Sequence, residues 1–143
     1  GVTTRVMTAI EIRQIAETYI RKRALRHLEK NRVVIYAAGT GNPYFSTDTA
    51  AALRAAETGA EVLFKATNVD GVYDKDPKLY DDATFYETLR HEDILLKDLK
   101  VMDGTAATLC RENDLDIVVF NMQDPYNFLR VLEGEGKATY IHS

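Results

Sequence analysis

The fold class of this chain is decided by the stretch Val33-Val34-Ile35-Tyr36-Ala37-Ala38-Gly39-Thr40-Gly41-Asn42-Pro43. Its apolar first half, rich in β-branched residues, predicts a strand covered on both faces, and the glycines and proline that follow end regular structure. An Ala-rich helix is expected over Asp48–Glu57, with a capping Ser or Thr before it and Gly59 after it. A second apolar strand is expected over Glu61–Lys65. The order strand, helix, strand predicts a parallel pair with a crossover helix.

Helices and apolar strands keep alternating on both sides of this unit. Further strands are expected at Phe85–Leu89, Asp116–Phe120 and Ala138–His142, and further helices at His91–Leu96, Asp103–Asn113 and from Asp124-Pro125 to Leu132. Upstream, the capping-box spacing of Thr8 and Glu11 and apolar residues at helical intervals predict that the first 30 residues are helical, as one bent helix or as two. The chain is therefore expected to be an α/β protein with a mostly parallel sheet.

Composition narrows the class of protein further. The chain has 143 residues, enough for one domain, and its 45% hydrophobic and 28% charged residues are ordinary for a globular fold. No apolar run approaches the ~18 to 20 residues that cross a bilayer. Cys110 is the single cysteine, and the three histidines do not have zinc-ligand spacing. We therefore expect one domain over residues 1–143, a cytoplasmic location, and neither a membrane partner nor a protein-bound metal.

Charge is unevenly distributed along the chain. The net charge is −4, yet the segment Arg21–Arg32 holds six Lys or Arg against one Glu. A segment with this positive charge can bind phosphates or nucleic acid. The acidic remainder of the chain and the lack of aromatic residues among the basic ones favour the solvated face of a helix instead. We therefore predict no nucleic-acid partner.

Two loops that follow strands carry the candidate binding residues. In the first, residues 38–48, small residues let the backbone approach a phosphate, and Tyr44 and Phe45 can line a base or a sugar. A glycine turn before a capped helix serves structure equally well. Asp48 stands in the first helical turn, where the helix dipole favours a carboxylate. Beside a bound anion, Asp48 would have to orient a cation.

The second loop, residues 65–77, offers Tyr73 for stacking on a base, although its polar composition also suits a solvated turn. Asp103 is explained as a helix N-cap and Cys110 as a small apolar residue. The chain has neither a Walker sequence nor a GxGxxG motif, and its histidines do not support a nucleophilic triad. The residues alone thus predict a nucleotide-binding or phosphate-binding α/β domain.

Together, the loops resemble the bacterial type of uridylate (UMP) kinase within the amino acid kinase fold family. The matching strings are Ala38–Pro43 with Thr47-Asp48, Lys65–Thr67, Val69–Tyr73 with Asp76-Pro77, Lys100–Asp103 and Val119–Asn121. The resemblance covers the chain end to end and the C-terminal three-fifths of the family. It implies a three-layer α/β/α fold, here apparently without its N-terminal part, and a kinase that transfers the γ-phosphoryl group of ATP to UMP in pyrimidine biosynthesis.

The resemblance also implies roles for individual residues. UMP is expected to bind Thr40, Gly41, Asn42, Pro43, Tyr44, Phe45, Ser46 and Thr47. ATP is expected at Thr67, Tyr73 and Asp76, and catalytic roles at Asp48 and Asp103. Mg²⁺ is expected to be held mainly through the phosphates of the nucleotides.

Members of the family are hexamers that GTP and UTP commonly regulate, which makes Arg32 the best candidate for an effector or interface residue. The family's N-terminal lysine segment and glycine-rich phosphate loops would precede Gly1, so we expect these 143 residues alone to transfer phosphate poorly. Two alternatives remain. One is a related kinase acting on a carboxylate or carbamate, against which Asn42, Tyr44 and Phe45 favour a nucleotide acceptor. The other is a catalytically inactive nucleotide-binding fragment.

Overall fold

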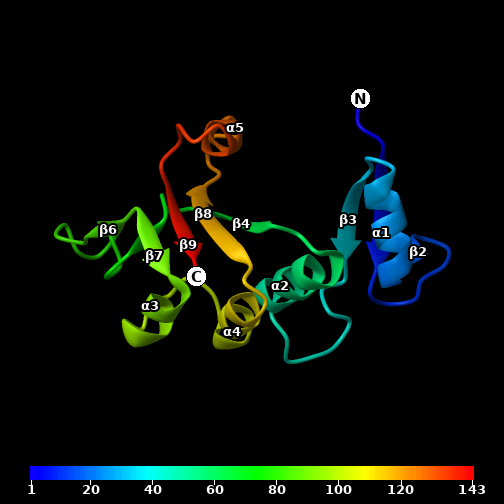
Figure 1. The fold of residues 1–143 in the computed structure, drawn as a ribbon, viewed down its shortest axis with the longest axis horizontal. Helices are drawn as coiled ribbons and strands as arrows, with labels where there is room; N and C mark the ends of the chain where they lie inside the picture. The colour runs from blue at the N-terminus through cyan, green and yellow to red at the C-terminus, as the bar shows by residue number, and fades with distance from the viewer. The chain divides into compact units, whose positions relative to one another are not determined.

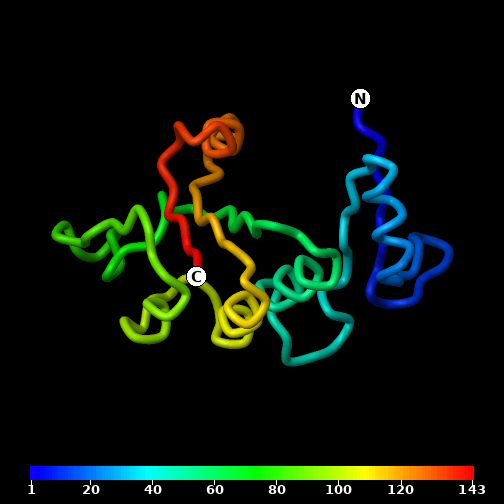
Figure 2. Tube along the Cα trace, in the orientation of Figure 1, coloured from blue at the N-terminus to red at the C-terminus, as the bar shows by residue number.

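The computed structural model describes residues 1–143, which form two compact units, Gly1–Ala60 and Glu61–Ser143. Figures 1 and 2 trace the chain through both units. Four of the six strand pairs are parallel, and helices alternate with strands along the chain. This confirms the predicted α/β class with mostly parallel pairing. None of the helices has the length and apolar character that a membrane crossing requires.

The first unit contains a three-stranded parallel sheet in the order β2-β1-β3. Its elements are β1 (Thr4–Thr8), β2 (Glu17–Thr18), α1 (Arg21–Glu29), β3 (Val33–Ala37) and α2 (Thr47–Thr58). The strand predicted at the start of the decisive stretch is confirmed as β3, and the helix after it as α2. The prediction that this strand is covered on both faces is wrong, because Val33 and Ile35 are 49% and 50% exposed. The Ser46 hydroxyl caps α2 by accepting from the Thr49 N–H, and Gly59 ends it in a left-handed conformation at φ 68°.

The prediction of helix over the first 30 residues is wrong before Arg21. Residues 4–8 form β1 and pair along their whole length with β3, from Thr4 opposite Val33 to Thr8 opposite Ala37. The Thr8 hydroxyl caps no helix; it donates to the Ile10 carbonyl and accepts from the Ile10 N–H, which makes a turn. Backbone pairing with β3 and burial of Met7, which is 0% exposed, therefore override the local helical spacing.

The second unit contains a four-stranded sheet in the order β4-β8-β9-β7 and a separate two-stranded hairpin, β5-β6 (Figure 1). Its elements are β4 (Val62–Thr67), β5 (Val72–Tyr73), β6 (Phe85–Tyr86), β7 (Thr88–Arg90), α3 (His91–Leu96), α4 (Gly104–Glu112), β8 (Asp116–Asn121), α5 (Asn127–Leu132) and β9 (Ala138–His142). Buried side chains of β8, α5 and β9 form a core cluster, against which Phe64 of β4 packs.

Three further expectations about individual strands and helices need correction. The predicted parallel pair of β3 with β4 does not form, because β3 pairs with β1 and β4 pairs with β8. The strand expected over Phe85–Leu89 is divided between β6 and β7, which belong to different sheets. Helix α5 begins after Asp124-Pro125, since the Asp124 carboxylate accepts from the Tyr126 N–H in a turn.

Candidate functional site

The loop between β3 and α2, residues 38–46, bends sharply because several of its residues adopt positive φ. These residues are Ala38, Gly39, Gly41 and Tyr44. A Cβ atom at Gly41 would lie 3.0 Å from the Ala9 carbonyl oxygen and 3.2 Å from the Ala9 Cβ atom, at a φ of 74°. Both the conformation and the close approach therefore require glycine at this position.

Side chains of the same loop hold its shape and leave its outer surface open. The Thr40 hydroxyl accepts from the Asn42 N–H at 3.1 Å, and the Asn42 amide donates to the Thr40 carbonyl at 3.2 Å. Tyr44 is fully exposed and Phe45 is 54% exposed. The aromatic rings are thus available to a ligand that approaches the start of α2.

The residues predicted to bind UMP are brought together in the β3–α2 loop. The residues predicted to bind UMP, Thr40, Gly41, Asn42, Pro43, Tyr44, Phe45, Ser46 and Thr47, all lie in this loop or at the first residue of α2. Asp48 lies in the first turn of α2, half-buried, directly after them. An N-terminal helical turn presents backbone N–H groups and a positive dipole end, which together favour an anion.

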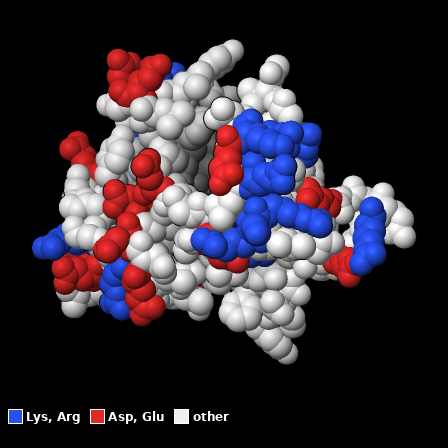
Figure 3. Space-filling model, turned by 45° about the vertical axis from the view of Figure 1, so that its right-hand side comes forward, with Lys and Arg blue, Asp and Glu red and all other residues white.

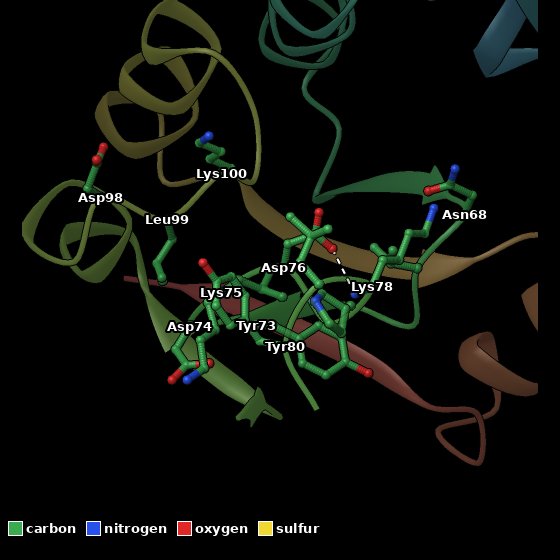
Figure 4. Close-up of a pocket in the computed structure, with 15 residues that line it drawn as sticks. Asn68, Tyr73, Asp74, Lys75, Asp76, Lys78, Tyr80, Asp98, Leu99 and Lys100 are labelled. Atoms are coloured by element: carbon green, nitrogen blue, oxygen red, sulfur yellow. Dashed lines mark hydrogen bonds between the residues drawn. The ribbon is translucent and has the colours of Figure 1, made fainter. Parts of the chain in front are cut away.

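The second unit contains a pocket of about 580 Å³, which we call the β5 pocket (Figure 4). Its walls are residues 68–80, which include β5, and the loop 98–100 between α3 and α4. This volume lies within the range typical of small-molecule sites, roughly 300 to 1,000 Å³. The long polar segment after β4 therefore lines a cavity together with a second loop, while its residues 78–82 are exposed to solvent.

Three lysines line the β5 pocket and differ in their ion pairing. Lys75 pairs with Asp82 at 2.7 Å, whereas the ammonium groups of Lys78 and Lys100 form no salt bridge. Figure 4 shows Lys100 and Lys78 on either side of Asp76, with Tyr73 and Tyr80 below them in the view. The pocket thus offers two available cations and two aromatic rings to a ligand.

The residues predicted to bind ATP are only partly brought together. Tyr73 and Asp76 line the β5 pocket, and Tyr73 packs edge to face on Phe85 with ring centroids 5.2 Å apart. The Asp76 carboxylate accepts from the Lys78 N–H at 2.9 Å, so it holds a turn of the pocket wall. Thr67 is not among the lining residues; it ends β4, and its carbonyl accepts from the Met122 N–H.

Asp103 caps α4 by accepting from the Ala106 N–H at 2.9 Å, as its N-cap position predicted. It follows Lys100 of the β5 pocket by three residues. Asp48 and the β3–α2 loop belong to the first unit, whereas Asp103 and the β5 pocket belong to the second.

Residues 1–121 match the sequence profile of the amino acid kinase family. The chain belongs to this family. It is 57% identical over 141 residues to the chloroplastic uridylate kinase PUMPKIN of Arabidopsis thaliana, a match that covers 99% of this chain and 42% of that protein. The predicted membership in the amino acid kinase family is therefore confirmed.

Solved structures of two bacterial family members have the same fold. The UMP kinase from Ureaplasma parvum matches with a TM-score of 0.96 and 42% identity, over 99% of this chain and 61% of that chain. The UMP kinase from Bacillus anthracis matches with a TM-score of 0.93 and 36% identity, over 99% of this chain and 58% of that chain. The chain thus spans about 42 to 61% of the length of these family members.

Arg54 of α2 is a site residue that the sequence interpretation missed. Its guanidinium donates to the Gly39 carbonyl at 3.3 Å and pairs with Glu57 at 2.6 Å. Arg54 is only 8% exposed and lies one turn after Ala50, which is also buried. A charged residue on the buried face of an Ala-rich helix is the signal that could have identified it. In this family member, Arg54 anchors the first part of the β3–α2 loop.

Lys78 and Lys100 were also missed as individual site residues. Lys100 stands in one of the family-like strings, but nothing in its local sequence indicates that it faces a pocket. Lys78 follows a turn that Asp76 holds, and only the folded chain brings it to the same cavity as Lys100.

Arg32, the predicted effector or interface residue, lies between α1 and β3, directly before Val33. Its Nη1 donates to the His27 Nδ1 at 3.0 Å, so the neutral ring of His27 carries its proton on Nε2 and donates to Glu17 at 2.9 Å. An exposed groove of about 540 Å³ is lined by Ile20, Lys22, Arg23, Arg26, Glu29 and Lys30. Figure 3 shows Lys and Arg side chains gathered on one face of the molecule.

Proposed function

We propose that the protein is a nucleoside monophosphate kinase that transfers the γ-phosphoryl group of ATP to UMP, giving UDP, in pyrimidine nucleotide biosynthesis. The observation that carries this proposal is the β3–α2 loop, whose glycine turn, exposed aromatic rings and capped helix start make an anion site beside a surface for a base. The names of the relatives in plants and bacteria support it. We further propose that both units belong to one kinase domain.

UMP is proposed to bind at the β3–α2 loop, residues 40–47. The phosphate would accept hydrogen bonds from backbone N–H groups at the start of α2, where the helix dipole favours negative charge. Tyr44 and Phe45 are exposed and would pack against the uridine. Thr40 and Asn42 already bond to each other in the free chain, which organises the loop before a ligand arrives.

ATP, accompanied by Mg²⁺ held mainly through its phosphates, is proposed to bind in the β5 pocket. Tyr73 would contact the adenine, and Asp76 and Thr67 would shape the site. Lys78 and Lys100 would then neutralise the triphosphate, because their ammonium groups have no carboxylate partner. The lysines extend the set of ATP-binding residues that the sequence predicted.

The chemistry needs no strong base. A phosphate oxygen of UMP attacks the γ-phosphorus of ATP, the bond from that phosphorus to the bridging oxygen breaks, and ADP leaves with the electron pair. Catalysis then consists of aligning two polyanions and neutralising their charge. Asp48 and Asp103 are proposed to orient the cations around the transferred group, since each sits at a helix start, with Lys100 three residues before Asp103.

A homo-oligomer, a hexamer by family resemblance, is proposed as the working assembly. GTP and UTP are proposed effectors, with Arg32 and the basic groove of α1 as their candidate site, because that groove offers unpaired cations such as Lys22 and Arg26. Light scattering after size exclusion would measure the assembly, and an Arg32→Ala variant would lose the response to an effector. The cytoplasm stays the predicted location, whereas the relative from Arabidopsis thaliana is chloroplastic.

The test is UDP formation from UMP and Mg²⁺-ATP by the full-length protein, with CMP as the comparison acceptor. Turnover that is selective for UMP supports the proposal. Turnover of a carboxylate or carbamate in place of UMP would assign the protein to another kinase of the same fold. Nucleotide binding without any turnover would mean a catalytically inactive nucleotide-binding protein. The 143 residues on their own are expected to bind nucleotide and to turn over poorly.

A further inference from the structure

The hydroxyl of Thr139 on β9 is completely buried and bonds to both strands of the β5–β6 hairpin. It accepts from the Val72 N–H at 2.8 Å and donates to the Tyr86 carbonyl at 2.5 Å. Val72 and Tyr86 are directly opposite each other in the hairpin. One hydroxyl from the neighbouring sheet therefore holds both members of a single cross-strand pair.

Gly71 shows how closely the hairpin approaches β9. A Cβ atom at this position would collide with the Thr139 Oγ1 atom and would lie 2.8 Å from the Phe85 ring. Gly71 has no positive φ, so its backbone conformation does not require glycine. The requirement is space, and it exists because the hydroxyl of Thr139 occupies the position next to β5.

Lys137, the residue just before β9, makes a second contact with the segment that leads into β5. Its ammonium group lies 3.3 Å from the Asp70 carboxylate and 4.5 Å from the centre of the Phe85 ring. The other oxygen of Asp70 accepts from the Asn121 side chain at 3.2 Å. Asp70, just before β5, is thus held by Asn121 of β8 and by Lys137, which precedes β9.

Strand β5 forms part of the wall of the β5 pocket and carries Tyr73 into it. A hairpin with strands of two residues is unstable by itself, so its position depends on what it packs against. Strand β9 lies beyond residues 1–121, the part that matches the family profile. A segment outside that match therefore contacts the strand that carries Tyr73.

We propose that Thr139 is a positioning residue for the β5 pocket, because its buried hydroxyl fixes the β5–β6 hairpin and with it the ring of Tyr73. This inference rests on the proposed binding of ATP in that pocket. It predicts that the hydroxyl affects the affinity for ATP without touching the nucleotide. The affinity for UMP, which is proposed to bind in the β3–α2 loop of the first unit, should be unaffected.

The test compares Thr139→Val, which keeps the shape and removes the hydroxyl, with Thr139→Ser, which keeps the hydroxyl. Tyr140→Phe serves as the matched control, since it removes a hydroxyl from the adjacent residue of the same strand. Each variant of the full-length protein is assayed for the KM of ATP, the KM of UMP and kcat. Thr139→Val is expected to raise the KM of ATP about tenfold, with the KM of UMP unchanged, because it removes the hydroxyl that accepts from the Val72 N–H and donates to the Tyr86 carbonyl. Thr139→Ser and Tyr140→Phe should resemble the wild type.

An unchanged KM of ATP in a folded Thr139→Val protein would overturn the inference, and so would an equal rise in both KM values. Amide hydrogen exchange at Val72 provides a readout that needs no activity. It should accelerate about tenfold in Thr139→Val and stay at the wild-type rate in Thr139→Ser. If the wild-type protein binds no ATP, the proposed function fails, whereas unaltered exchange at Val72 in Thr139→Val shows that the hydroxyl does not hold the hairpin.

Discussion

The guanidinium of Arg54 donates to the carbonyl oxygen of Gly39 at 3.3 Å, which ties α2 to the loop that leads into it. The same group pairs with Glu57 and lies over the Tyr19 ring, 3.9 Å from its centre. Arg54 is buried, so these contacts are shielded from solvent. The geometry of the proposed UMP site therefore depends on a residue outside the loop itself.

Replacing Arg54 with Met should lower the free energy of unfolding by about 2 to 3 kcal/mol, because Glu57 and the Gly39 carbonyl lose a buried partner. It should also raise the KM of UMP more than the KM of ATP. Urea denaturation and steady-state kinetics measure the two effects. Arg13→Met, the control, removes an exposed pair with Glu11 and should lower the free energy of unfolding by less than about 1 kcal/mol. An equal loss of unfolding free energy in the two variants would contradict the anchoring role of Arg54.

Gly41→Ala should weaken UMP binding and destabilise the fold by about 1 to 3 kcal/mol. The added methyl group meets the Ala9 carbonyl at 3.0 Å in a backbone conformation that disfavours a side chain. Gly59→Ala is the matched control: φ is 68° there, but nothing lies within 4 Å of the added atom. Gly59→Ala should lower the free energy of unfolding by about 1 kcal/mol without altering the KM of UMP. A Gly41→Ala protein that keeps the wild-type KM would show that the loop shape is not needed for UMP.

Lys78→Ala and Lys100→Ala should each raise the KM of ATP about tenfold, since each removes a cation that is available to the triphosphate. Neither change should affect the KM of UMP to a similar extent. Arg130→Ala, which removes an exposed pair with Asp124 outside the pocket, provides the control. If Arg130→Ala weakens ATP binding as much as the pocket variants do, the loss reflects the overall charge of the protein and not the two pocket lysines.

Burial lowers the pKa of His91 below its usual value, and the nearby carboxylates of Asp116 and Asp114 only partly oppose this. The unfolded chain therefore binds a proton at a higher pH than the folded chain does. The free energy of unfolding should fall as the pH drops from 7 through about 6.5 toward the lowered pKa, by at most about 1.4 kcal/mol per pH unit. His91→Leu should remove this dependence in urea denaturation between about pH 5.5 and 7.5. An unaltered pH profile would exclude His91 as its source.

Several features of the fold and of the site follow from local sequence alone. The apolar run at β8 forms a strand with four buried residues, and the run at β3 also forms a strand, although Val33 and Ile35 stay about half exposed. Ser46 and Asp103 cap helices through their own side chains, so their positions predict where α2 and α4 begin. The glycine turn at residues 39–41 and the family-like strings around it also depend only on neighbours in the chain, and they led to the correct family.

Other features were decided by tertiary contacts between segments far apart in the sequence. The first strand forms because β3 supplies hydrogen-bond partners for residues 4–8, which local spacing presents as helical. The β5 pocket exists because residues 98–100 close the cavity that residues 68–80 begin, and the hairpin within it is held by Thr139, 67 residues away from Val72. Arg54 reaches Gly39 only after α2 has folded back on the loop. Caps, turns and apolar runs act over a few residues, whereas partners for buried polar groups are chosen by the whole fold, and no local pattern encodes that choice.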